Sequence, residues 1–415
     1  RYKLTLGGLQ GEDRWKLTRA ILTDLGRPRL QKNETLNKLV DELDGHPLAM
    51  QALLPHLEST TPKTLLDKLH TELATLDTGD DQTDRLFATL RFVESSIPTG
   101  LRDLLAPLSM HERFVDADHL ALMCKWHGGA FDQSNVDGLL SILTTAGLVQ
   151  PVGSPIYRIH PMLTSYLRET LGEQDDAWKT AFVGVMAVFA DRWSRKPLHQ
   201  QRPLFFVHES NLTRALGAAR GLVEKPGNED LRTNQAALVQ SLATYALNSR
   251  HWDRAESLYE RLLHVNKRRD DQERVAAAYH QLGRVAQEQR EWETAERWCR
   301  KSLAISEEQN IEQLAAKTYH QLGIVAQEQR EWETAEGWYR KSLEIKERQG
   351  NEHGAATTYH QLGRVAQEQR EWETAEGWYR KALEIFGRQG NEHGAATTYH
   401  QLGIVAQEQR EWETA

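Results

Sequence analysis

The chain has 415 residues, 51 basic and 59 acidic, so it lacks the basic excess of general nucleic-acid binders. Its two cysteines, Cys124 and Cys299, exclude a disulfide framework and favour a reducing compartment, the cytoplasm. No apolar run approaches the ~18 residues that cross a bilayer, so we expect no membrane association. The sequence begins at Arg1 without a methionine and ends at Ala415 inside a repeat, so we expect a fragment.

Residues 1–80 predict a small helical domain. An amphipathic helix is expected over 12–25. A second helical pattern follows, whose apolar side chains share one face: Leu36, Leu39, Val40 and Leu43. Gly45 can end that helix, and Pro47 can occupy the first turn of the next.

Residues 81–172 follow the pattern of a winged helix. Helices are expected first, at about 84–95, 99–107, 116–123 and 133–146. A hairpin then ends at His160, and Pro161 starts a helix through Leu171. The predicted recognition helix, 133–146, has no Lys or Arg and one Asp, so we expect poor phosphate contacts and no DNA binding.

Two short motifs in these domains resemble those of the NB-ARC class of signal-transducing NTPases, the STAND proteins. Residues 45–49, Gly-His-Pro-Leu-Ala, resemble the family's Gly-Leu-Pro-Leu motif. Residues 159–161, Ile-His-Pro, resemble its Met-His-Asp motif, with the His matched and the Asp replaced. The resemblance implies an ADP site in which Pro47 lies against the adenine and His160 touches the β-phosphate. If the resemblance does not hold, residues 45–49 form an ordinary junction between two helices, and His160 caps the wing.

The sequence lacks the motifs that phosphoryl transfer requires. It contains no Gly-x-x-x-x-Gly-Lys-[Ser/Thr] phosphate loop and no acidic strand end placed to hold Mg²⁺. We therefore predict no ATP hydrolysis by this chain, and ADP or ATP would be a cofactor of the full-length protein. Cys124 and His127 lie three residues apart on a predicted core helix and are expected to be inert, so we predict no catalytic residue.

Residues 173–230 are expected to be linker helices. They include the longest apolar run, 181–190, which predicts a buried helix. Residues 209–216 resemble the helix that often bridges NB-ARC domains to their repeats.

Residues 231–415 repeat with a period of 40. His-Gln-Leu-Gly begins at His280, His320, His360 and His400. Each repeat predicts two amphipathic helices, which must stack on neighbours to bury their apolar faces. One repeat carries the tetratricopeptide pattern at Tyr359, Leu362, Gly363, Ala375, Tyr379 and Ala382. The resemblance to that family implies a right-handed α-solenoid. The usual repeat has about 34 residues, so the extra length must lie in the helices or the turn between repeats.

In such solenoids the first helix of each repeat lines the concave face. Its polar positions recur at steps of three or four residues and are the expected contacts for a protein or peptide partner. These positions are His280, Arg284, Gln287, His320, Gln327, Thr357, His360, Arg364, Gln367 and Glu368. The alternative is a solvated helix face without a ligand. Each repeat has one such histidine, and helix packing places neighbouring histidines ~10 Å apart. They are too far apart to bind the same zinc ion, so we predict no metal site.

Together these patterns predict a mainly α protein: a helical domain (1–80), a winged-helix domain (81–172), linker helices (173–230) and a solenoid of tetratricopeptide repeats (231–415). The leading interpretation is the regulatory or sensor part of a nucleotide-switched signalling protein. A partner on the repeats would favour an open state that exchanges nucleotide and self-associates. The alternatives are a pure interaction scaffold without nucleotide binding and a winged-helix transcription regulator.

Overall fold

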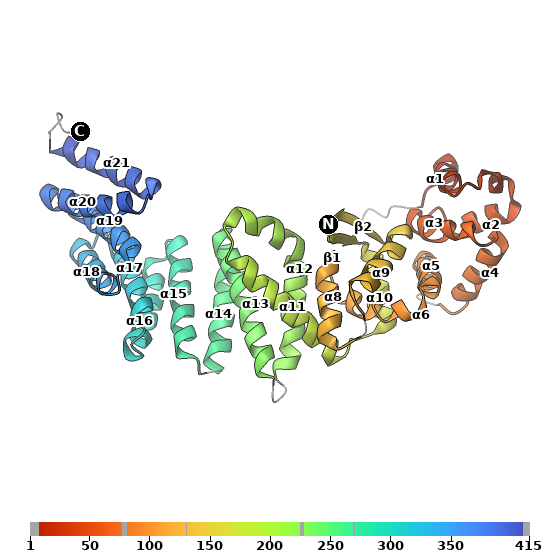
Figure 1. Cartoon of the computed structure of the whole chain (residues 1–415), viewed down its shortest axis with the longest axis horizontal. Helices are drawn as coiled ribbons and strands as arrows, with labels where there is room; N and C mark the ends of the chain where they lie inside the picture. Colours follow the sequence, from red (N-terminus) through yellow and green to blue (C-terminus); the bar gives the residue numbers. More distant parts are fainter. Residues whose placement is uncertain (1–7, 77–80, 130, 225–227, 269, 410–415) are drawn as a thin grey trace. The chain divides into compact units, whose positions relative to one another are not determined.

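The structure, a computed structural model, describes residues 8–76, 81–129, 131–224, 228–268 and 270–409. The chain divides into two compact units, which we call the front unit (Arg1–Leu238) and the repeat array (Val239–Ala415). Both are mainly helical, which confirms the predicted fold class (Figure 1). The boundary lies within α13 (Glu229–Asn248). The finer division of the front unit at residues 80 and 172 stays a prediction.

The front unit begins with short helices packed around leucines. They are α1 (Gly11–Asp24), α2 (Glu34–Glu42), α3 (Pro47–Leu53), α4 (Pro62–Leu73) and α5 (Asp81–Ser96), with 3-10 turns at Pro28–Lys32 and Leu54–Glu58. Leu36, Leu39 and Val40 are fully buried, which confirms the predicted apolar face of α2. Gly45 has φ +62°, and a Cβ there would lie 2.0 Å from the carbonyl oxygen of Leu9, so the turn before α3 requires glycine.

A three-stranded antiparallel sheet lies within the front unit. Its strands β1 (Phe114–Asp116), β2 (Val149–Gly153) and β3 (Ile156–Ile159) follow the order β1-β3-β2. The helices around it are α6 (Thr99–Arg102), α7 (Leu105–Ser109), α8 (Ala117–His127), α9 (Gln133–Thr145) and α10 (Pro161–Leu171). The hairpin and α10 lie where the sequence predicts them, but β1 is not predicted, because three residues are too few to show alternation.

Two long helices, α11 (Asp176–Ser194) and α12 (Leu198–Val223), follow α10 and pack against each other. Most of the apolar run 181–190 is buried in α11, as predicted. α12 also contacts β1. The sheet and its covering helices therefore share one core with the predicted linker.

The repeat array is a succession of helices of equal length (Figure 1). They are α14 (Trp252–Arg268), α15 (Gln272–Glu288), α16 (Trp292–Glu308), α17 (Glu312–Glu328), α18 (Trp332–Arg348), α19 (Glu352–Glu368), α20 (Trp372–Arg388) and α21 (Glu392–Glu408). Each has 17 residues, and every connection between them is three residues long. The extra length of the 40-residue repeat therefore lies in the helices and not in the turns.

Candidate functional site

The two helices of each repeat approach closely at a glycine of the first helix. A Cβ on Gly363 would lie 2.7 Å from the ring of Tyr379, and one on Gly323 would lie 2.6 Å from the ring of Tyr339. Both tyrosines are fully buried. Because this contact repeats, it sets a constant distance between α17 and α18 and between α19 and α20. The first helix of each repeat is therefore held at the same distance from its second helix.

The predicted partner-binding histidines lie in the contact between successive first helices. Nδ1 of each histidine pairs with the hydroxyl of a threonine 38 residues later, at 3.3 Å for His280, 3.2 Å for His320 and 3.0 Å for His360. Burial lowers the pKa of His280 to about 4, of His320 to about 3 and of His360 to about 4, so all three rings are neutral. These histidines stabilise the stacking of repeats.

The predicted glutamines also make bonds inside the array. The hydroxyl of Tyr339 donates to Oε1 of Gln327 at 3.0 Å, and that of Tyr379 donates to Oε1 of Gln367 at 2.9 Å. Nε2 of Gln321 donates to Oε1 of Gln287 in the preceding repeat. The glutamines thus fix one helix to the next.

The charged and hydroxyl positions are more accessible. Arg284 and Arg364 are half-buried and each donates to a glutamine three residues earlier, at 3.1 and 3.4 Å. Thr357 is half-buried, and its hydroxyl donates to the backbone carbonyl of Gly354 at 2.8 Å, whereas Glu368 is exposed. Lys317, which lies on α17 near His280, is exposed. The surface that a partner can reach on the first helices therefore offers cations at Arg284, Lys317 and Arg364, together with the carboxylate of Glu368.

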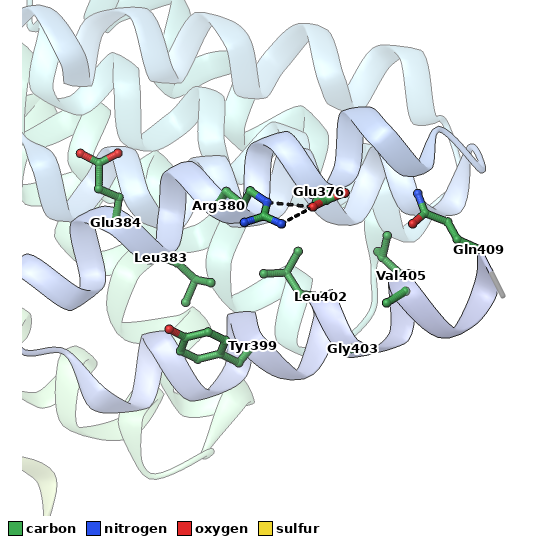
Figure 2. Close-up of a pocket in the computed structure, with 10 residues that line it drawn as sticks. Glu376, Arg380, Leu383, Glu384, Tyr399, Leu402, Gly403, Val405 and Gln409 are labelled. Atoms are coloured by element: carbon green, nitrogen blue, oxygen red, sulfur yellow. Dashed lines mark hydrogen bonds and ion pairs between the residues drawn. The ribbon is translucent and has the colours of Figure 1, made fainter. Parts of the chain in front are cut away.

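A pocket lies between α20 and α21 (Figure 2). Its lining residues are Glu376, Arg380, Leu383, Glu384, Tyr399, Leu402, Gly403, Val405, Ala406 and Gln409. Tyr399 is 65% exposed, whereas the equivalent Tyr359 stacks on Trp378 with ring centroids 5.6 Å apart. The pocket therefore corresponds to the place that the second helix of a repeat occupies in the preceding repeats.

The two motifs predicted to contact ADP lie close together in the front unit. His46 precedes Pro47 at the start of α3. Burial lowers the pKa of His160 at the start of α10, and the charge of a protonated His46 lowers it further. Nδ1 of His160 accepts the N–H of Met162 at 3.3 Å, so the neutral ring carries its proton on Nε2. Pro47 is exposed and His160 half-buried. Both are accessible, and the side chain of His160 caps α10, the helix after the hairpin, instead of the wing itself.

A buried polar cluster at the end of β1 has no signature in the sequence. Asp116, His119 and His208 are 8%, 2% and 1% exposed, and their ligand-type atoms lie within 4.8 Å of one another. Burial raises the pKa of Asp116 to about 6 and lowers that of His119 to about 2 and of His208 to about 4. Residues 116, 119 and 208 show no local pattern, because 89 residues separate the last two along the chain.

A second feature that the sequence does not reveal is the contact of Asn211 with β1. Asn211 is fully buried on α12, where its Oδ1 accepts the N–H of Glu112 at 2.6 Å and its Nδ2 donates to the carbonyl of Phe114 at 2.8 Å. It satisfies two backbone groups at the start of β1, one just before the strand and one in its first residue. The segment 209–216, singled out by resemblance, is thus part of the front unit's core.

Both cysteine side chains are buried, and Cys124 lies on a core helix, as predicted. Burial raises the pKa of Cys124 to about 11 and that of Cys299 to about 12. His127 stacks on Trp178 instead of facing the thiol, with ring centroids 3.7 Å apart. None of the helices that the structure describes has both the length and the apolar character needed to span a bilayer.

Comparison with known families identifies the repeats. Models of the tetratricopeptide repeat match residues 238–273, 275–308, 314–388 and 354–415. The repeat array therefore consists of tetratricopeptide repeats, a module that typically binds proteins or peptides. These matches lie outside most of the front unit, so the NB-ARC and winged-helix resemblance stays a prediction. Among curated proteins, no sequence matches this chain.

Several solved structures are similar at low identity. BtubC from P. vanneervenii is 23% identical with a TM-score of 0.43, over 49% of this chain and 83% of that one. A signal-transduction ATPase with numerous domains and a tetratricopeptide repeat sensor, from Pyrococcus horikoshii, is 14% identical with a TM-score of 0.38, over 99% of this chain and 67% of that one. The apo form of RapI is 15% identical with a TM-score of 0.37, over 60% of this chain and 92% of that one. Scores this low carry no function over to this chain.

Proposed function

We propose that the repeat array binds an acidic protein or peptide segment along the first helices of its repeats. The observation that carries the proposal is the accessibility of Arg284, Lys317 and Arg364, while the neighbouring histidines and glutamines are engaged within the array. Their cations come from three successive repeats. An extended ligand with carboxylates can therefore contact more than one repeat.

The experiment is a selection of peptides from a random display library on the intact chain. We expect the bound peptides to be enriched in Asp and Glu. Selection on the double variant Arg284→Glu and Arg364→Glu should lose that enrichment. A matched control, Arg340→Glu, changes an arginine of the second helix that is paired with Glu336 and should keep it. Enrichment that is the same on all three proteins would contradict the proposal.

We further propose that the front unit contributes to nucleotide control, with Pro47 against the adenine and His160 donating from Nε2 to a phosphate of ADP. The proximity of the two motifs and the tautomer of His160 support this role. A partner on the repeats would then favour nucleotide exchange and self-association. The order α7, β1, α8, α9, β2, β3 supports a winged-helix domain, and the lack of basic residues in α9 favours a packing role for it over DNA binding.

This second role is tested by adding ADP to the chain and following the imidazole NMR signals. The expected result is a shift of the His160 signal that disappears when Pro47 is changed to Glu. His70, an exposed histidine of α4, is the control and should not shift. Equal shifts at His160 and His70 would show unspecific binding and contradict the role.

A further inference from the structure

The cluster of Asp116, His119 and His208 joins three elements of the front unit. Asp116 is the last residue of β1 and the N-cap of α8, His119 lies in the first turn of α8, and His208 lies in α12. All three side chains are buried, and none belongs to the sites described above. Such a set of two imidazoles and one carboxylate is a typical donor set for a divalent transition metal.

The polar atoms converge without forming hydrogen bonds to one another. Oδ1 of Asp116 accepts the N–H groups of Asp118 at 3.0 Å and His119 at 3.2 Å, whereas Oδ2 forms no hydrogen bond with the described residues. Nε2 of His119 lies 3.6 Å from Oδ2, and Nε2 of His208 lies 4.0 Å from it. Both distances exceed those of a hydrogen bond. Three donors therefore face a common point and do not satisfy one another.

The other nitrogen of each ring is also without a hydrogen bond. Within the described part of the chain, Nδ1 of His119 and Nδ1 of His208 are buried and have no partner. Aromatic side chains surround them: the ring of His119 lies 3.9 Å from that of Phe189, and the ring of His208 lies 4.7 Å from that of Trp193. Buried polar atoms without partners are unfavourable, and a flip of either ring would present Nδ1 in place of Nε2 to an ion beside Oδ2 of Asp116. Both rings can also turn without breaking a hydrogen bond.

We propose that Asp116, His119 and His208 bind one divalent metal ion of the zinc class, with a water molecule as the fourth ligand. Zinc lies about 2.0–2.2 Å from such donors, and in a tetrahedral site the donors are roughly 3.3 Å apart. The separations of 3.6 and 4.0 Å, and the remaining one of at most 4.8 Å, would shorten to this distance by rotation of the side chains around the ion. The backbone bonds to Oδ1 of Asp116 orient the carboxylate, as the outer-shell contacts of metal ligands do.

The ion would connect α12 to β1 and α8 beside the Asn211 contact. His208 and Asn211 are three residues apart on α12, so they lie on one face of that helix. Asn211 fixes the helix to the backbone at the start of β1, and the ion would fix it to the last residue of the same strand. Metal binding should therefore stabilise the front unit, and this role does not depend on a nucleotide or on a partner of the repeats.

The test uses the intact chain after treatment with a chelator, with Co²⁺ and Zn²⁺ as probes. We expect one Co²⁺ per chain, the visible absorption of a tetrahedral cobalt site, its displacement by Zn²⁺, and a rise in melting temperature with either metal. His208→Gln should abolish the absorption band and the rise. The control is His199→Gln, which changes an exposed histidine of the same helix and should leave both unchanged.

A second variant covers the case in which His208→Gln fails to fold. Asp116→Asn retains an N-cap side chain for α8, because Asn caps helices as well as Asp does. It should fold and bind Co²⁺ at least tenfold more weakly. A cobalt band that persists in both variants would place the metal elsewhere, for example at His46 and His160, and overturn the proposal. Absence of binding to the wild-type chain at a tenfold excess of Co²⁺ and Zn²⁺ would also overturn it.

Discussion

The front unit and the repeat array satisfy their buried polar groups in different ways. In the array the same bond recurs at a fixed separation, 38 residues for each histidine and its threonine and 12 for each tyrosine and its glutamine. In the front unit each bond occurs once and joins distant segments, as Asn211 joins Glu112. Buried nitrogens there, such as Nδ1 of His119, lack a partner within the described residues.

This difference has consequences for stability. Contacts in a solenoid are made between neighbours, so damage to one repeat is expected to stay in that repeat and the next. Contacts such as that of Asn211 close a loop of 99 residues, so their loss affects the whole front unit. The front unit should therefore respond to a mutation as a whole, and the repeat array should respond repeat by repeat.

The largest effect is expected for Asn211→Ala. It would leave the N–H of Glu112 and the carbonyl of Phe114 without this buried partner and also create a cavity, at a cost of about 3–5 kcal/mol. Hydrogen–deuterium exchange should rise throughout the front unit, while the repeat array keeps its protection. Ser210→Ala, which removes one partly buried bond to Glu112, is the control and should cost about 1 kcal/mol or less. Faster exchange confined to residues 112–116 would contradict the cooperative behaviour.

A smaller and local effect is expected for Gly363→Ala. The added Cβ would lie 2.7 Å from the ring of Tyr379 and force α19 and α20 apart, at a cost of roughly 1–3 kcal/mol. The matched control is Gly403→Ala at the equivalent position of α21, where no described atom lies within 4 Å of such a Cβ. Hydrogen exchange should increase in α19 and α20 for the first variant and nowhere for the second. Similar behaviour of the two variants would contradict the repeat-by-repeat description.

Lys346 marks a natural difference between two repeats that are otherwise nearly identical in sequence. It is buried and donates to the hydroxyl of Thr358 at 2.7 Å, whereas the equivalent residue in the next repeat is the buried Phe386. Burial lowers the pKa of Lys346 to about 8 from 10.5. Between these values the unfolded chain binds more protons than the folded one, so the free energy of unfolding rises with pH in this window.

Lys346→Phe should therefore stabilise the array at pH 7 by on the order of 1–2 kcal/mol and remove this rise between pH 8 and pH 10. Chemical unfolding curves followed by tryptophan fluorescence at several pH values measure both effects. The reverse change, Phe386→Lys, should destabilise the array at pH 7 and introduce the same rise. A rise that is unchanged in Lys346→Phe would show that another group causes it.

The sequence predicts much of the array because its information is local and repeated. The period of 40, the apolar spacing and Gly363 together indicate two helices per repeat and their close contact. The sequence does not show that His280 and Gln327 are engaged inside the array, because a polar residue on a helix face looks the same whether a partner, a neighbouring helix or water covers it. In the front unit the motifs at Pro47 and His160 are recognisable, but the Asp116 cluster is assembled only by folding.

The smallest effect is expected for Tyr379→Phe. It tests whether the glutamines are bound to a neighbouring helix or are available to a ligand. The change removes the bond to Oε1 of Gln367 and should cost about 1 kcal/mol, because Gln367 is half-buried and water can replace the hydroxyl. Tyr399→Phe, at an exposed residue, is the control and should cost nothing measurable. In a double-mutant cycle with Gln367→Ala, the second change should cost little once Tyr379 is Phe. If Gln367→Ala instead costs the same in both backgrounds, its partner is not Tyr379, and the side chain is available to a ligand as the sequence pattern predicts.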